Sequence, residues 1–246
     1  MKNKTVLITG ALAGIGRATA FAFAQEGANI VISGRKNEIG ESLAKELCAS
    51  GVDVVFVRAD VRYEEEVKSL IDTTMKRFGR LDVAVNNAGT EGQPVSIVDE
   101  TLENYQATFD TNVLGVFLCL KYELKVMMEQ GSGCIINLSS IAGHTGVPGA
   151  SIYCATKHAV EGFTKVAALE AAGAHVRVNA VAPGPISTDM FERFTGTEEN
   201  RAAFLERVPL KRAGLPDEVA QTIVFLASDK ASFITGKVIG IDGGMT

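Results

Sequence analysis

Short β-branched runs alternate with longer segments of helical period along the whole chain, and this alternation constrains the fold more than any other feature. We expect strands at residues 5–9, 29–33, 52–57, 81–85, 134–139, 175–182 and 237–242. We expect helices at residues 14–27, 37–50, 63–78, 101–130 and 152–172. The strand segments are apolar on both faces, which is typical of parallel strands covered on both sides. The pattern therefore predicts an α/β, Rossmann-type doubly wound fold of about seven parallel strands with helices on both faces.

No linker, internal repeat or low-complexity tract divides the chain, so residues 1–246 are expected to form a single domain. Such sheets bind ligands at the carboxyl ends of their strands. One segment, residues 187–212, breaks the alternation because it is polar and irregular. Long connections of this kind often serve as lids. We predict a substrate lid here, with Met190, Phe191 and Phe194 closing over the substrate.

Composition argues against several classes of function. The net charge is −5 and the basic residues are scattered, so no nucleic-acid surface is expected. No apolar run approaches the roughly 20 residues that a membrane span needs. The N-terminus shows no secretory signal pattern, which favours a cytoplasmic location. The four cysteines form no CxxC pair and there are three histidines, so no metal site is predicted.

A glycine-rich loop follows the first expected strand. The sequence TGALAGIGRA places Gly10, Gly14 and Gly16 in a GxxxGxG spacing, with Ile15 between the last two, just before a helix. Glycine permits a tight turn and a close approach of the backbone to a pyrophosphate, and the helix N-terminus offers free N–H groups. The position of the loop in a βαβ unit therefore predicts a dinucleotide site.

The end of the second expected strand bears on which dinucleotide is bound. NAD enzymes of this architecture usually carry an acid here for the ribose 2′-hydroxyl. This chain has Ser33-Gly34-Arg35-Lys36, and the nearest acid, Glu38, already belongs to the next helix. Arg35 can instead make charge-assisted contacts to a 2′-phosphate. We therefore predict NADP(H) as the cofactor, with NAD(H) as the open alternative.

A tyrosine and a lysine stand one helical turn apart in YCATK, residues 153–157. Tyr153 and Lys157 share a helix face at this spacing. A cationic lysine favours the phenolate, and we expect it to lower the tyrosine pKa so that the side chain can exchange a proton near neutral pH. Ser140 ends the fifth expected strand, where its hydroxyl can bind a substrate oxygen. Asn112 lies in the preceding helical region and is a candidate member of a polar relay.

Over essentially its full length, the chain resembles the short-chain dehydrogenase/reductase family. The matching motifs are TGALAGIG at 9–16, Asp60-Val61, NNAG at 86–89, Asn112 within NVLG, Ser140 thirteen residues before Tyr153, YCATK at 153–157 and PGPIST at 183–188. The resemblance implies NAD(P)-dependent reversible hydride transfer between the cofactor and a carbonyl or secondary alcohol.

The resemblance also implies roles for individual residues. Its catalytic tetrad is Asn112, Ser140, Tyr153 and Lys157: Tyr153 exchanges the proton, Ser140 orients the substrate oxygen, Lys157 lowers the tyrosine pKa and holds the ribose, and Asn112 anchors a relay water. Its cofactor contacts are Asp60 and Val61 at the adenine, Asn87, Ala88 and Gly89 along the cleft, Pro183 and Gly184 in the PGPIST motif, and Ile186 and Thr188 at the carboxamide. NADP-using members often carry a basic residue where this chain has Ala13, so Arg35 alone favours NADP.

The substrate is left open by the sequence. We expect the lid and the loop at residues 90–93 to shape its site. His144 is either a substrate contact or a plain loop residue. The main hypothesis is a reductase of ketones or aldehydes. The alternatives are a 3-oxoacyl-(acyl carrier protein) reductase and a non-catalytic dinucleotide sensor. Apolar residues on more than one face of the helices at 101–130 and 152–172 predict a homotetramer.

Overall fold

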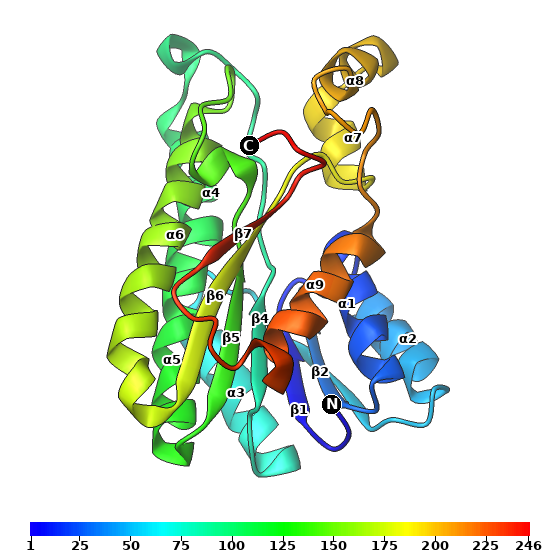
Figure 1. The fold of residues 1–246 in the computed structure, drawn as a ribbon, viewed down its shortest axis with the longest axis vertical. Helices are drawn as coiled ribbons and strands as arrows, with labels where there is room; N and C mark the ends of the chain where they lie inside the picture. Colours follow the sequence, from blue (N-terminus) through cyan, green and yellow to red (C-terminus); the bar gives the residue numbers. More distant parts are fainter.

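The computed structural model describes all residues, 1–246, and joins seven parallel strands in one sheet (Figure 1). The strand order is β3-β2-β1-β4-β5-β6-β7, so the direction of winding reverses between β1 and β4. The strands are β1 (Thr5–Ile8), β2 (Asn29–Gly34), β3 (Val54–Arg58), β4 (Val83–Asn86), β5 (Gly133–Leu138), β6 (Val176–Pro183) and β7 (Val238–Ile241). The predicted doubly wound fold is confirmed, with strand ends within one or two residues of those expected.

Helices cover both faces of the sheet (Figure 1). The helices are α1 (Gly14–Gln25), α2 (Asn37–Cys48), α3 (Glu64–Phe78), α4 (Leu102–Phe109), α5 (Gly115–Gln130), α6 (Ser151–Ala171), α7 (Asp189–Thr195), α8 (Glu198–Leu205) and α9 (Pro216–Ala227). Val6 and Ile8 of β1 pack with α1, α2 and α9, whereas Leu7 packs with α3, α5 and α6. The apolar residues on both faces of each strand therefore fill two separate cores.

Two helical expectations need correction. The region 101–130 is not one helix, because a π-helical stretch, Asp110–Leu114, separates α4 from α5. Helix α9, which crosses the sheet face beside α1, was not predicted. Its signal was present: Pro216 occupies the first turn, and the Glu218 side chain accepts a hydrogen bond from the backbone N–H of Leu215 at 2.7 Å.

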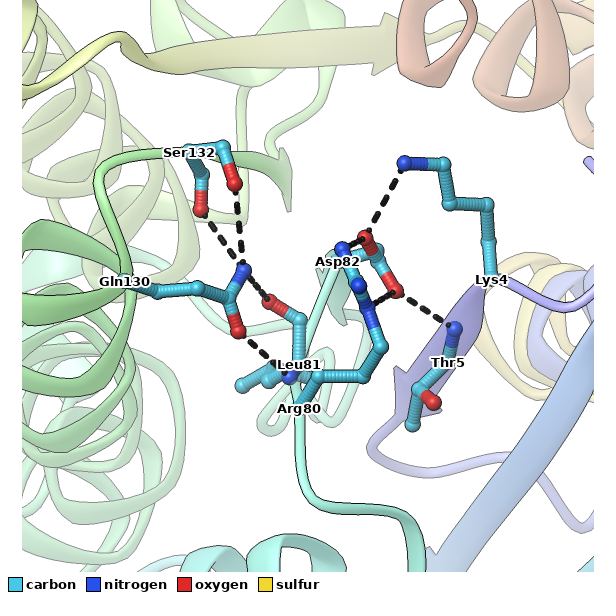
Figure 2. Close-up of polar contacts among 7 residues, drawn as sticks. All are labelled: Lys4, Thr5, Arg80, Leu81, Asp82, Gln130 and Ser132. Atoms are coloured by element: carbon cyan, nitrogen blue, oxygen red, sulfur yellow. Dashed lines mark hydrogen bonds and ion pairs between the residues drawn. The ribbon is translucent and has the colours of Figure 1, made fainter.

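Polar contacts tie β1 to β4 at the amino end of the sheet, opposite the candidate site (Figure 2). Asp82, just before β4, accepts hydrogen bonds from the Thr5 backbone N–H at 2.9 Å and from Lys4 Nζ at 3.2 Å. Arg80 Nε donates to the same carboxylate at 2.7 Å. The side chain of Gln130, at the end of α5, bonds to the backbone N–H and C=O of Leu81.

No helix combines the length and the apolar character that a bilayer crossing requires.

Candidate active site

The glycine-rich loop packs tightly against the end of β4. A Cβ atom at Gly10 would lie 2.8 Å from Ala88 Cα, and one at Gly16 would lie 2.5 Å from Asn87 Nδ2. Asn87 Nδ2 donates to the carbonyl oxygens of Thr9 at 3.0 Å and Gly10 at 2.9 Å. These contacts explain why the loop needs glycine, since any side chain would push it away from the strand.

The N-terminus of α1 opens toward the same edge of the sheet. The helix begins at Gly14, whose φ of 52° lies in the left-handed region, and its N-cap, Ala13, makes no side-chain hydrogen bond. A Cβ at Gly14 would lie 3.2 Å from Thr188 Cγ2. Free amides at a helix N-terminus and a backbone without side chains make a cradle that fits the pyrophosphate of a nicotinamide dinucleotide.

The region beyond β2 and β3 contains the predicted adenine-end residues. Asp60 is buried, and Arg62 Nη2 donates to its Oδ2 at 2.7 Å. The neighbouring Val61 is also buried and packs beside Gly115 at the start of α5. Arg35, at the end of β2, is exposed and forms no ion pair, so its guanidinium is free to meet an anion.

Tyr153 and Lys157 come from the first two turns of α6, and Ser140 follows the end of β5. All three line one cavity of about 170 Å³. Lys157 Nζ donates to the backbone oxygen of Leu138 at 2.7 Å and lies 5.5 Å from the centroid of the Tyr153 ring. The i, i+4 spacing thus places the phenol and the amine side by side, as the sequence indicated.

The electrostatics of this pair differ from the expectation. Burial raises the pKa of Tyr153 to about 12, and hydrogen bonding by Ser140 only partly opposes it. Burial also lowers the pKa of Lys157 to about 8. Lys157 is not among the groups that shift the Tyr153 pKa in this structure, where its ammonium donates to the Leu138 oxygen. The lowering of that pKa by the lysine and a bound nicotinamide stays a prediction for the cofactor complex. Tyr153 is therefore a phenol at neutral pH, able to donate a proton.

Asn112 occupies the π-helical stretch between α4 and α5 and is 1% exposed. Its Oδ1 accepts from the Thr90 backbone N–H at 2.8 Å, and its Nδ2 donates to the Thr90 oxygen at 2.8 Å and to Thr156 Oγ1 at 3.1 Å. Gly89 lies directly against this amide, since a Cβ there would be 3.3 Å from Asn112 Oδ1. Asn112 therefore connects the loop after β4 to α6 but does not itself line the cavity.

The cavity collects most of the remaining predicted residues. Those that line it are Ile15, Asn87, Gly89, Ser140, Tyr153, Lys157, Pro183, Gly184, Ile186, Thr188, Met190, Phe191 and Phe194. The lid aromatics turn inward: Phe191 and Phe194 both pack edge-on against Phe204, with ring centroids 5.7 and 6.2 Å apart. Three further lining residues were not predicted, although each is an apolar residue of the lid or of the loop after Ser140: Phe204, Val147 and Ile141.

His144 does not line the cavity. Its Nδ1 lies 3.0 Å from Oε1 of the buried Glu161, which also accepts from Ser139 Oγ at 2.9 Å. Glu161 stands on α6 two turns beyond Tyr153. The structure therefore gives His144 a contact with α6, and its contact with substrate stays a prediction.

An ion pair joins two distant segments at the wall of the cavity. Glu91, in the loop after β4, lines the cavity, and Arg193 of α7 donates to it. The sequence pointed to residues 90–93 as a shaping loop but gave no sign of this pairing, since the partners are 102 residues apart.

Comparisons with known proteins agree with this geometry. A family model described as enoyl-(acyl carrier protein) reductase matches residues 10–246. A 3-oxoacyl-[acyl-carrier-protein] reductase of Synechocystis sp. is 45% identical over 98% of this chain and 96% of its own length. The solved structure of levodione reductase is 36% identical, with a TM-score of 0.97 over 99% of this chain and 98% of its own. A variant of actinorhodin polyketide ketoreductase, solved with NADPH, is 34% identical, with a TM-score of 0.95 over 100% of this chain and 99% of its own.

Proposed function

Because the chain belongs to the short-chain dehydrogenase/reductase family and is an NAD(P)-dependent oxidoreductase, we propose that it reduces small, largely apolar ketones or aldehydes with NADPH. The reverse reaction oxidises the corresponding alcohols. The observation that carries the proposal is the cavity itself: Tyr153, Ser140 and Lys157 face a space walled by Ile141, Val147 and the aromatic lid. An apolar wall with a few convergent polar groups is typical of small-molecule sites.

The chain's own residues account for the proton transfer. The bound nicotinamide cofactor supplies the hydride. Ser140 donates a hydrogen bond to the carbonyl oxygen and orients it toward Tyr153. The Tyr153 phenol, protonated because its pKa lies near 12, gives its proton to that oxygen as negative charge develops. Lys157 holds the ribose, and Asn112 supports the relay that reprotonates the site.

Cofactor contacts are proposed for the residues around the glycine-rich loop. Gly10, Gly14, Ile15 and Gly16 meet the pyrophosphate, and Asp60 and Val61 flank the adenine. Asn87, Ala88, Gly89, Pro183, Gly184, Ile186 and Thr188 line the nicotinamide half. Arg35 selects the 2′-phosphate of NADP(H), which is supported by its exposure and lack of an ion pair and by the related ketoreductase structure with NADPH.

A specific relative favours a second candidate, because the Synechocystis protein is named for reduction of an acyl-carrier-protein thioester. Carrier proteins are acidic and need a basic surface at the site mouth. Here four of the five basic residues of the lid region pair with carboxylates, and Arg207 stacks over Phe204 instead. The five are Arg193, Arg201, Arg207, Lys211 and Arg212. This neutralised surface favours a free small molecule as substrate.

Steady-state assays with purified protein separate the two candidates. Cyclic and aliphatic ketones, 3-oxoacyl thioesters of a small thiol and the same acyl group on acyl carrier protein are offered with NADPH and with NADH. We expect the highest kcat/KM with free ketones, and no gain when the thioester is moved onto the carrier protein. A large gain from the carrier protein would instead establish the second candidate.

The one-sheet architecture supports a single dinucleotide-binding domain over residues 1–246, in which residues 187–212 act as the substrate lid. The structure gives that segment two short helices, α7 and α8, whose apolar side chains face the cavity. We propose that α7 and α8 move away from the rest of the domain to admit the substrate, and then close over it. The predicted cytoplasmic location stays a prediction, which cell fractionation would test.

A homotetramer is proposed because α4, α5 and α6 share an apolar surface hollow. Its apolar lining comprises Leu102, Tyr105, Phe109, Val113, Leu114, Phe117 and Phe163. Leu102 is 86% exposed and Leu169, further along α6, is 81% exposed. Contiguous apolar surface of this kind marks an interface. Its continuation over three helices fits a second copy of the same chain, as one of the interfaces that a tetramer needs.

A further inference from the structure

Glu91 brings a carboxylate into the substrate cavity and is held there by the lid. Its side chain is 11% exposed, whereas that of Arg193 is 61% exposed. Arg193 Nε donates to Glu91 Oε1 at 2.7 Å, and Nη2 approaches Oε2 at 3.4 Å. The guanidinium therefore lies on the solvent side of the pair and the carboxylate on the cavity side.

Glu91 is the one acidic residue that lines the cavity. The other charged lining residue, Lys157, donates its ammonium to the Leu138 oxygen. Most other lining side chains are apolar, and in such surroundings a charge acts more strongly than it would in water. Its influence reaches the reacting group: after burial, the charge of Glu91 is among the causes that raise the pKa of the Tyr153 phenol to about 12.

We propose that Glu91 is a specificity-determining residue, whose carboxylate makes the enzyme select uncharged carbonyl substrates and reject those with a carboxylate close to the reacting carbonyl. An anion near Tyr153 would meet the like charge of Glu91 in a poorly solvated space. The Arg193 guanidinium offsets part of this charge from the solvent side, but the Glu91 carboxylate is the member of the pair that faces the cavity, so it is the nearer charge to a substrate anion. This inference rests on the proposed carbonyl reductase function and names its substrate class more closely.

A matched substrate pair tests the inference. Ethyl acetoacetate and acetoacetate present the same ketone, without and with a negative charge two carbons away. The measured quantity is the kcat/KM of the ester divided by that of the acid, with saturating NADPH. We expect this ratio to be at least about tenfold in the unmutated protein. In Glu91→Gln it should fall about tenfold, a change of ~1.4 kcal/mol, mostly through a lower KM for the acid.

Two further variants locate the effect. Arg193→Met removes the guanidinium and leaves the carboxylate, so the ratio should stay high or rise. Glu198→Gln removes an ion-paired acid on α8 that lies outside the cavity, and its ratio should match that of the unmutated protein. A purely structural role of Glu91 in holding the lid would instead lower both kcat/KM values in Glu91→Gln and leave their ratio unchanged.

The outcomes separate this inference from the proposed function. If the unmutated protein reduces neither the ester nor any other neutral ketone, the proposed function fails. If it reduces the ester and the acid equally well, the inference fails, whether or not the variants fold. An unchanged ratio in a folded Glu91→Gln protein would also overturn it.

Discussion

Replacing Glu123 with Gln is expected to change how the stability of the protein depends on pH. Glu123, on α5, is 0% exposed. Its Oε2 accepts a hydrogen bond from Asn86 Nδ2 at 2.9 Å, while its Oε1 and Asn86 Oδ1 are buried acceptors without a partner. Burial raises the pKa of this carboxyl from 4.5 to about 7, against the opposing effect of the Asn86 bond. Protonation of Glu123 adds one hydrogen-bond donor beside the two acceptors that have no partner.

The magnitude follows from proton linkage. Between pH 4.5 and about 7 the folded protein keeps a proton that the unfolded chain releases. The folded pKa is the higher one, so the stability conferred by this proton is complete below pH 4.5 and is lost as pH rises to about 7. The loss is ~1.4 kcal/mol per pH unit, about 3 kcal/mol in all. Glutamine keeps the hydrogen bond from Asn86, adds N–H donors and does not titrate.

Urea denaturation of both proteins, followed by circular dichroism from pH 5 to pH 8, measures the effect. The free energy of unfolding of Glu123→Gln, relative to the unmutated protein, should rise by about 2.5 kcal/mol over this range. Glu129→Gln is the matched control, because Glu129 is an exposed acid on the same helix. Parallel pH profiles of Glu123→Gln and the unmutated protein would show that the buried carboxyl does not hold its proton in this range.

Four other outcomes are expected. Tyr153→Phe should lower kcat by about 10²-fold or more and leave NADPH binding, measured by fluorescence, nearly intact; retention of more than a few per cent of the activity would contradict the proton-transfer role. Arg35→Ala should reduce kcat/KM for NADPH about tenfold or more with little change for NADH, whereas Lys36→Ala, its exposed neighbour, should do neither; a preference for NADH in the unmutated protein would refute the cofactor assignment. Asp82→Asn should cost about 1.5–3 kcal/mol at pH 7. Burial alone would raise the pKa of Asp82, but hydrogen bonds from Arg80, Thr5 and Lys4 outweigh it and hold the pKa below its ordinary 3.8. The stability that the Asp82 carboxylate contributes is therefore present above pH 3.8 and is lost as the pH falls through the folded pKa. In acid denaturation curves, the stability difference between Asp82→Asn and the unmutated protein should shrink accordingly. Light scattering at micromolar concentration should give four times 26.0 kDa; a monomer would refute the tetramer.

The layered architecture and the expected position of the site could be predicted from the amino-acid sequence. The alternation of strand and helix periods is a local property, so seven strands could be located without tertiary information. The glycine spacing of residues 10–16 reflects local backbone needs, and the spacing of Tyr153 and Lys157 places both on one helix face whatever surrounds them. The NNAG and PGPIST motifs follow strands whose carboxyl ends meet at one edge. Parallel topology then brings them together.

The electrostatics of the site and the long-range contacts depend on the folded structure. The pKa of Tyr153 depends on how much surface covers the phenol and on where the Lys157 ammonium points, and neither is encoded in the spacing of the two residues. His144 is drawn toward Glu161, and Glu91 meets Arg193 of α7, because packing of the whole chain brings these loops and helices together. Burial and the pairing of distant side chains are sums over many contacts, so they became visible only when the chain was folded.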